Sequence, residues 1–64
     1  MTPAELIRKL RRLGAAVTAQ GKGGHSTVRL GGRKTVVPMH GKKDLKTGTL
    51  AAILRDLGIA KDDL

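Results

Sequence analysis

Two adjacent glycines, Gly31-Gly32, constrain the fold more than any other feature of this chain. Both central positions of a type I′ turn need a positive φ, so a Gly-Gly pair between two alternating segments predicts a β-hairpin. The two strands are expected over residues 25–30 and 33–38, the second of which carries β-branched valines. A hairpin of this kind fixes which residues face each other and which share a face.

Folding the two strands back about the turn sets His25 across from Pro38, and Arg29 across from Lys34. Side chains alternate between the two faces of a strand. His25, Arg29 and Lys34 are therefore expected on the face opposite Val28. That face is basic, and a histidine lies on it.

A helix is predicted before the hairpin. Thr2 is suited to cap it, Pro3 fits the first helical position, and Glu5 lies where a capping-box carboxylate reaches back. Gly14 is placed to end the helix in a left-handed conformation. An apolar stripe at helical spacing is expected to enter the core, and it consists of Leu6, Ile7, Leu10 and Leu13.

A second helix is predicted after the hairpin. Gly58 is placed to terminate it, with Ile59 folding back as in a Schellman ending. Its start is open, because several residues are suitable caps: Asp44, Thr47 and Thr49. Its apolar stripe, also expected in the core, consists of Leu50, Ile53, Leu54 and Leu57.

The remaining segments complete an α-β-β-β-α order. Residues 15–20 read as a weak strand of small residues, 21–24 as a glycine-rich loop and 60–64 as a short helical turn or a frayed end. The predicted fold is α+β, a three-stranded antiparallel sheet with two helices on one face. With 64 residues and neither aromatic residues nor cysteine, the chain forms one domain with a small aliphatic core.

The charge of the chain predicts a polyanionic partner. The formal net charge is +8, and residues 1–46 hold eleven Lys or Arg against two acidic residues. A nucleic acid is the natural partner for such an excess, ahead of a membrane surface. We expect a cytoplasmic protein, because no membrane span or signal-peptide run is present.

Four motifs follow one another along residues 6–59. A glycine-rich loop leads to a histidine on a strand, a hairpin ends in Val-Pro-x-His, a Leu-Lys-x-Gly-Thr-Leu segment enters the last helix, and Ile-Leu-x-x-Leu-Gly-Ile closes it. Here they are Gly21–His25, Val37–His40, Leu45–Leu50 and Ile53–Ile59. In this order, and in a chain of this length and charge, they resemble the HicA (YcfA-like) toxin family.

The resemblance implies a double-stranded-RNA-binding-domain-like fold that acts as a ribonuclease, with residues 1–64 as one toxin domain. It implies a type II toxin that cuts mRNA and is neutralised by a HicB-type antitoxin covering the His25 face. His25, after the glycine-rich loop, matches the catalytic histidine of the family. Three positions depart from the family pattern: Gly24 replaces a serine, Ser26 replaces a second histidine, and Ala15-Ala16 stand where an aromatic residue is common.

The chemistry of imidazole supports the same role for His25. RNA cleavage needs a base for the 2′-OH proton and an acid for the leaving 5′-oxygen, and imidazole, which ordinarily titrates at about pH 6.5, can act as either. The alternative is an ordinary surface histidine. His40 is either a second acid/base group or a loop residue that bonds the backbone near Pro38. Two histidines without cysteine disfavour a metal site, so we expect metal-independent cleavage without a cofactor.

The residues expected to bind RNA surround this histidine in sequence. The glycine-rich loop is either a flexible turn or a backbone contact to phosphate, and Arg33 is a candidate to stabilise the phosphorane by its charge. Such binding weakens steeply as the salt concentration rises. The predicted set is Lys22, Gly23, Gly24, Arg29, Arg33, Lys34, Lys42 and Lys43.

Two other functions fit the same residues. One is a non-catalytic double-stranded-RNA-binding module of the same fold, in which His25 is incidental and the lysines before the second helix dock on phosphates. The other is a structural partner in a ribonucleoprotein, which rests on the charge alone.

Overall fold

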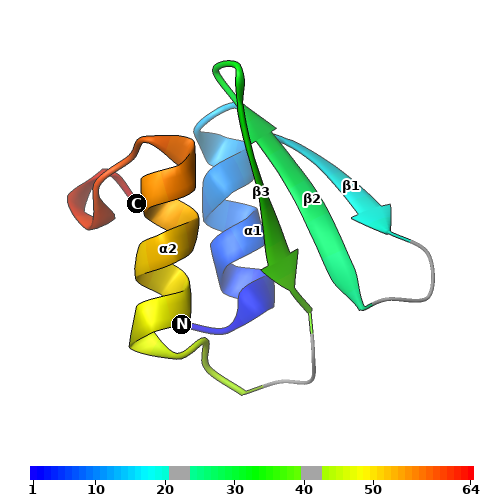
Figure 1. Ribbon diagram of the computed structural model, residues 1–64, viewed down its shortest axis with the longest axis vertical. Helices are drawn as coiled ribbons and strands as arrows, with labels where there is room; N and C mark the ends of the chain where they lie inside the picture. The colour runs from blue at the N-terminus through cyan, green and yellow to red at the C-terminus, as the bar shows by residue number, and fades with distance from the viewer. Residues whose placement is uncertain (21–23, 40–42) are drawn as a thin grey trace.

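The computed structural model describes residues 1–20, 24–39 and 43–64, without the side chains of residues 19 and 20, and has the predicted α-β-β-β-α order (Figure 1). The three strands form one antiparallel sheet in the order β1-β2-β3. Within the described ranges, no helix is long and apolar enough to cross a membrane. The elements are α1 (Pro3–Arg12), β1 (Ala16–Gln20), β2 (His25–Leu30), β3 (Arg33–Pro38), α2 (Thr47–Leu57) and a 3-10 turn, η2 (Lys61–Asp63).

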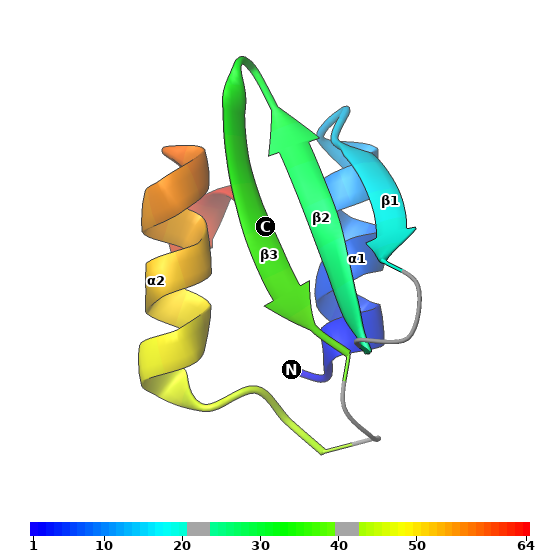
Figure 2. The ribbon, with the colours of Figure 1, turned by 45° about the vertical axis from the view of Figure 1, so that its right-hand side comes forward.

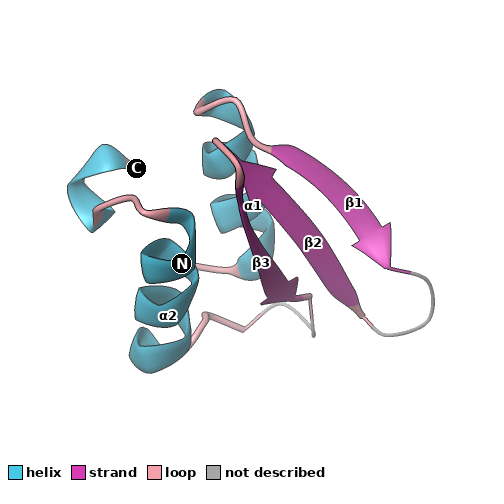
Figure 3. Ribbon diagram, turned by 45° about the horizontal axis from the view of Figure 1, so that its top comes forward, coloured by secondary structure: helices cyan, strands magenta, loops and turns pink. Residues whose placement is uncertain are grey.

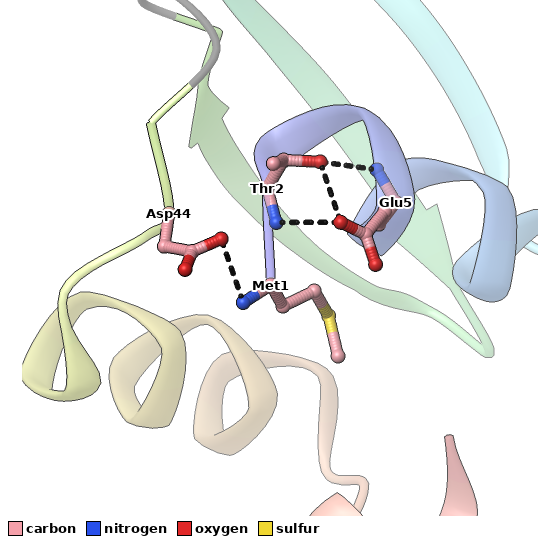
Figure 4. A network of polar contacts seen from close by, with 4 residues as sticks. All are labelled: Met1, Thr2, Glu5 and Asp44. Carbon is pink, nitrogen blue, oxygen red and sulfur yellow. Dashed lines mark hydrogen bonds and ion pairs between the residues drawn. The ribbon is translucent and has the colours of Figure 1, made fainter.

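The start of α1 is a complete capping box, as predicted (Figure 4). The Thr2 hydroxyl oxygen accepts a hydrogen bond from the Glu5 N–H at 3.2 Å, and Glu5 Oε1 accepts from the Thr2 N–H at 3.4 Å. Nearby, the Met1 amino nitrogen lies 3.1 Å from Asp44 Oδ1, and the Leu45 N–H donates to the Met1 carbonyl at 2.8 Å. These contacts hold the segment before α2 against the start of α1.

The end of α1 differs from the prediction at one residue. The helix ends at Arg12, and Gly14 has the predicted positive φ, 97°. Leu13 is the C-cap residue and is 40% exposed, so its assignment to the core was wrong. The chain leaves the helix here, because the Ala15 N–H turns back to the Leu10 carbonyl at 3.1 Å. The side chain of Leu13 therefore no longer follows the helical stripe.

The hairpin has the predicted turn and register. Gly31 and Gly32 have φ of 56° and 82°, as a type I′ turn requires. His25 pairs with Pro38 and Arg29 pairs with Lys34. β1 adds to the other side of β2, with Val17 opposite Val28.

Both helices pack on one face of the sheet, and the views of Figures 2 and 3 show them on the same side. The Thr35 hydroxyl lies on this side and donates to Asp56 Oδ2 of α2 at 3.0 Å. The buried hydrophobic core is aliphatic throughout the described ranges. It is therefore stabilised by the burial of aliphatic side chains, without an aromatic ring. It consists of Leu6, Ile7, Leu10, Val28, Val37, Ile53, Leu54 and Leu57.

The two ends of α2 have different caps. Lys46 is the N-cap and makes no capping hydrogen bond through its side chain, so none of the three possible caps, Asp44, Thr47 and Thr49, is the N-cap residue. At the other end, Gly58 is left-handed with a φ of 70°, and the Ile59 N–H donates to the Leu54 carbonyl at 3.1 Å. This is the predicted Schellman ending.

We predict opposite effects on stability for two glycines of this helix. Gly58→Ala forces an L-residue into the left-handed region, which costs about 1–2 kcal/mol, and its Cβ would lie 2.8 Å from Arg33 Nε. The matched control is Gly48→Ala, where nothing lies within 4 Å and φ is not positive; it should stabilise by about 0.4–1 kcal/mol. Thermal unfolding followed by circular dichroism measures both, and equal shifts would contradict the prediction.

Candidate active site on the open face of the sheet

Among the described residues, both helices pack on the same face of the sheet, and we call the opposite face the open face. Because side chains alternate along a strand, it holds the residues of β2 and β3 that point away from Val28 and Val37, and their partners on β1. All five acidic residues lie on α1, α2, η2 or the segment before α2, and none lies on a strand. The described side chains of the open face are Ala16, Thr18, His25, Thr27, Arg29, Lys34, Val36 and Pro38.

His25 is the first residue of β2 and is half-buried. Its strand is extended by one more bond, because the Met39 N–H donates to the Gly24 carbonyl at 2.6 Å. Gly24 itself has a φ of 63°, a conformation that side chains with a Cβ rarely adopt. The backbone conformation therefore accounts for a glycine at this position, and the imidazole lies at the first residue of β2.

Arg29 and Lys34 lie directly opposite each other on the open face, and both are exposed. Like charges at such a pair of positions destabilise a sheet. In the part of the chain that the structure describes, neither cation forms an ion pair with a carboxylate. The pair lies about 13 Å from His25 along β2, four residues at the usual rise of a strand.

A hollow of about 200 Å³ lies on the open face. Arg29 and Lys34 line one end, and the adjoining row of three paired residues lines the rest. In that row Thr27 is 6% exposed, whereas Val36 is 47% exposed. The row is Thr18, Thr27 and Val36.

Thr18, Thr27 and Val36 were missed as site residues by the sequence reasoning. The hairpin register already placed Thr27 across from Val36, so the signal for these two was available. No turn motif specifies the pairing of β1, and Thr18 was therefore not predictable.

Two of the predicted RNA-binding cations, Arg33 and Lys43, lie in different places relative to His25. Arg33 alternates to the helix-covered face, where its guanidinium lies beside Gly58, about 16 Å from His25 along the hairpin. Lys43 is exposed and lines a cavity of about 210 Å³ together with Pro38, the residue paired with His25. Arg33 is thus not brought together with His25, whereas Lys43 lies near the His25 end of the sheet.

Four predicted site residues lie outside the described residues. They are Lys22, Gly23, His40 and Lys42. Among the residues that are described, no three histidines or carboxylates gather as metal ligands would. The described candidate site thus consists of an imidazole, a cation pair that lines one end of a hollow, and an uncharged row of residues between them.

Comparison with known proteins identifies the family. The model of the family described as the HicA toxin of bacterial toxin–antitoxin systems matches residues 3–59. This range includes both helices and the whole sheet, and the chain belongs to that family. Its resemblance to the HicA family in sequence motifs is thereby confirmed.

A named relative points the same way. A "Probable mRNA interferase HicA" of Pseudomonas fluorescens (strain Pf0-1) is 44% identical to this chain over 39 residues. The matched segment spans 61% of this chain and 65% of the relative, just under two thirds of its length.

The cation pair predicts that Lys34→Glu stabilises the protein. The substitution replaces a repulsion across from Arg29 with an attraction, which should raise the free energy of unfolding by about 0.2–1 kcal/mol. Lys34→Gln is the matched control, because it removes the repulsion alone and should stabilise less. Urea unfolding at low and high salt measures the difference, which should shrink as salt rises. A less stable Lys34→Glu protein would contradict the prediction.

Proposed function

We propose that this protein is a metal-independent endoribonuclease that cleaves mRNA, with His25 as the catalytic acid/base residue. The observation that carries the proposal is the place of His25 on an open face that bears two further cations and no carboxylate. A polyanion can lie on such a face without meeting a like charge. The family match and the name of the Pseudomonas relative support RNA as that polyanion.

The proposed reaction is a transesterification within the RNA chain. The 2′-OH loses its proton, its oxygen bonds to the phosphorus, the bond from phosphorus to the 5′-oxygen breaks, and that oxygen takes up a proton. The products are a 2′,3′-cyclic phosphate and a 5′-hydroxyl. No metal ion or cofactor enters any of these steps.

His25 supplies one of the two proton transfers. A positioned imidazole contributes about 10²–10⁴-fold to a rate of this kind, as either base or acid. The other transfer falls to His40 or to water. Arg29 and Lys34 hold the RNA strand by its phosphates, and Lys43 adds positive charge near the His25 end of the sheet.

The partner that we propose is a HicB-type antitoxin that covers the His25 face. The family match supports an antitoxin of some kind, because its description names toxin–antitoxin systems. The open face favours a protein that lies directly on the sheet, since no helix within the described ranges covers it. Because its substrate is mRNA, we place the protein in the cytoplasm.

A second candidate is a non-catalytic double-stranded-RNA-binding module. One observation favours it: Lys43 and Lys46 line the same cavity at the start of α2. In this alternative these lysines dock on the phosphates of a duplex, and His25 takes no part. The two functions differ in whether the RNA is cut, and in whether removal of the imidazole slows that cleavage.

The test compares the wild type with His25→Ala on a long single-stranded RNA in the presence of EDTA. We expect the wild type to cut, with 2′,3′-cyclic phosphate ends, and the variant to be slower by about 10²–10⁴-fold. Both should bind the RNA equally, which fluorescence anisotropy measures. His40→Ala is the matched control, because it removes the other imidazole and reports whether His40 takes part.

Three results would contradict this proposal. Wild-type protein that leaves the RNA intact, with or without EDTA, would favour the binding module. Equal cutting by His25→Ala would show that the catalytic group lies elsewhere. Inhibition of the wild type by EDTA alone would contradict the metal-independent mechanism.

A further inference from the structure

The proposed function gives a role to the two cations at one end of the hollow, but none to the row of Thr18, Thr27 and Val36 that lines the rest. We propose that this hollow binds one unpaired nucleotide of the RNA next to the cleaved bond, with its phosphate between Arg29 and Lys34 and its ribose or base against Val36. This inference rests on the proposed function and adds a substrate subsite to it. It also names the substrate class, RNA that is single-stranded at the site of cleavage.

The cation pair indicates a bound anion. Arg29 and Lys34 are directly paired across two strands, both are exposed, and neither has a carboxylate partner among the described residues. Their mutual repulsion destabilises the sheet. A phosphate placed between them replaces this repulsion with two attractions, and a guanidinium suits phosphate by its geometry.

The rest of the hollow suits the uncharged parts of a nucleotide. Val36 is 47% exposed although it is aliphatic, and the exposed Thr18 of the same row offers a hydroxyl group. Thr27, which is 6% exposed, lies between them. An apolar side chain near a hydroxyl group and two cations matches a ribose or base that is joined to a phosphate.

The size of the hollow favours a single nucleotide over a duplex. Its volume is about 200 Å³, below the roughly 300–1,000 Å³ of pockets that take drug-sized ligands. Proteins recognise double-stranded RNA mostly by its shape across a wide minor groove, whereas unpaired nucleotides are splayed out into local sites. A local hollow of this size corresponds to the second mode.

The distance between the hollow and His25 allows one RNA strand to contact both. The row formed by Thr18, Thr27 and Val36 lies two residues from His25 along β2, about 7 Å, and the cation pair lies about 13 Å away. Both places are on the same face. A nucleotide in the hollow can therefore be covalently continuous with a phosphate at His25.

The first experiment measures binding apart from cleavage. A short single-stranded RNA is titrated into His25→Ala protein, with and without the pair Arg29→Gln/Lys34→Gln, over a range of salt concentrations. Each phosphate that the protein neutralises contributes about 0.7 to the slope of log K against log salt for single strands, so losing the one phosphate held between Arg29 and Lys34 should lower the slope by about 0.7. The control is Arg8→Gln/Arg12→Gln on α1, which removes the same charge from exposed positions away from the open face and should leave the slope unchanged.

The second experiment measures which nucleotide the hollow selects. RNAs randomised at the positions beside one cleaved bond are cut by protein that retains His25, with Val36→Thr or Thr18→Val as nearly isosteric changes. We expect the ratio of kcat/KM between nucleotides to change at least five-fold at one of these positions and to stay unchanged at the others. Thermal unfolding of each variant checks that the sheet is intact.

The results separate the hollow from the proposed function. Equal slopes for the Arg29/Lys34 variant and the Arg8/Arg12 control would overturn the hollow as a phosphate site, even if the wild type cuts RNA. Stronger binding to a duplex than to the single strand would also overturn it. Loss of antitoxin affinity in the hollow variants, with RNA binding unchanged, would assign the surface to a protein partner instead. Absence of cleavage by the wild type is a failure of the proposed function, and the slopes still decide whether the hollow binds RNA.

Discussion

The register of the β2–β3 hairpin is the constraint on which the rest of this structure depends. A shift by one residue would turn one of the two strands over, and would move either Val28 or Val37 from the core to the open face. If β2 turned over, Arg29 would enter the core. The core has no aromatic residue to offset such a loss. The Gly31-Gly32 turn therefore specifies the aliphatic core and the cationic surface together, because each is one face of the same two strands.

The face of the sheet that we propose to bind RNA takes no part in the helix packing that stabilises this small domain. One face of the sheet supplies the whole contact with both helices, and the other face remains uncovered. The uncovered face includes a pair of opposed cations that lowers the stability of the sheet. Two like charges that face each other at a cost in stability, as Arg29 and Lys34 do, indicate a binding role. This indication does not depend on the histidine.

The parts of the fold that could be predicted are those that local chemistry determines. The capping box at Thr2, the hairpin register and the Gly58 ending each depend on residues close together in the chain. Leu13 was wrongly placed in the core, because helical spacing does not report the residue at which a helix stops. The start of α2 was left open among several possible caps, and none of them is the N-cap, which is Lys46.

The candidate site was predictable in part for the same reason. His25, Arg29 and Lys34 were placed together by the hairpin alone. Arg33 was grouped with them by charge, although alternation puts it on the other face. The hollow was missed, because it needs β1 beside β2 and no motif in the sequence specifies that pairing.

The absence of acidic residues from the strands has a consequence for encounter as well as for binding. Positive charge lies on both sides of the sheet, because α1 carries four cations behind it and Arg29 and Lys34 lie on the open face. Such an excess raises the rate of collision with a polyanion, most strongly at low ionic strength. The open face differs from the rest of this cationic surface in having no carboxylate on any strand, so a polyanion that slides onto it meets no like charge.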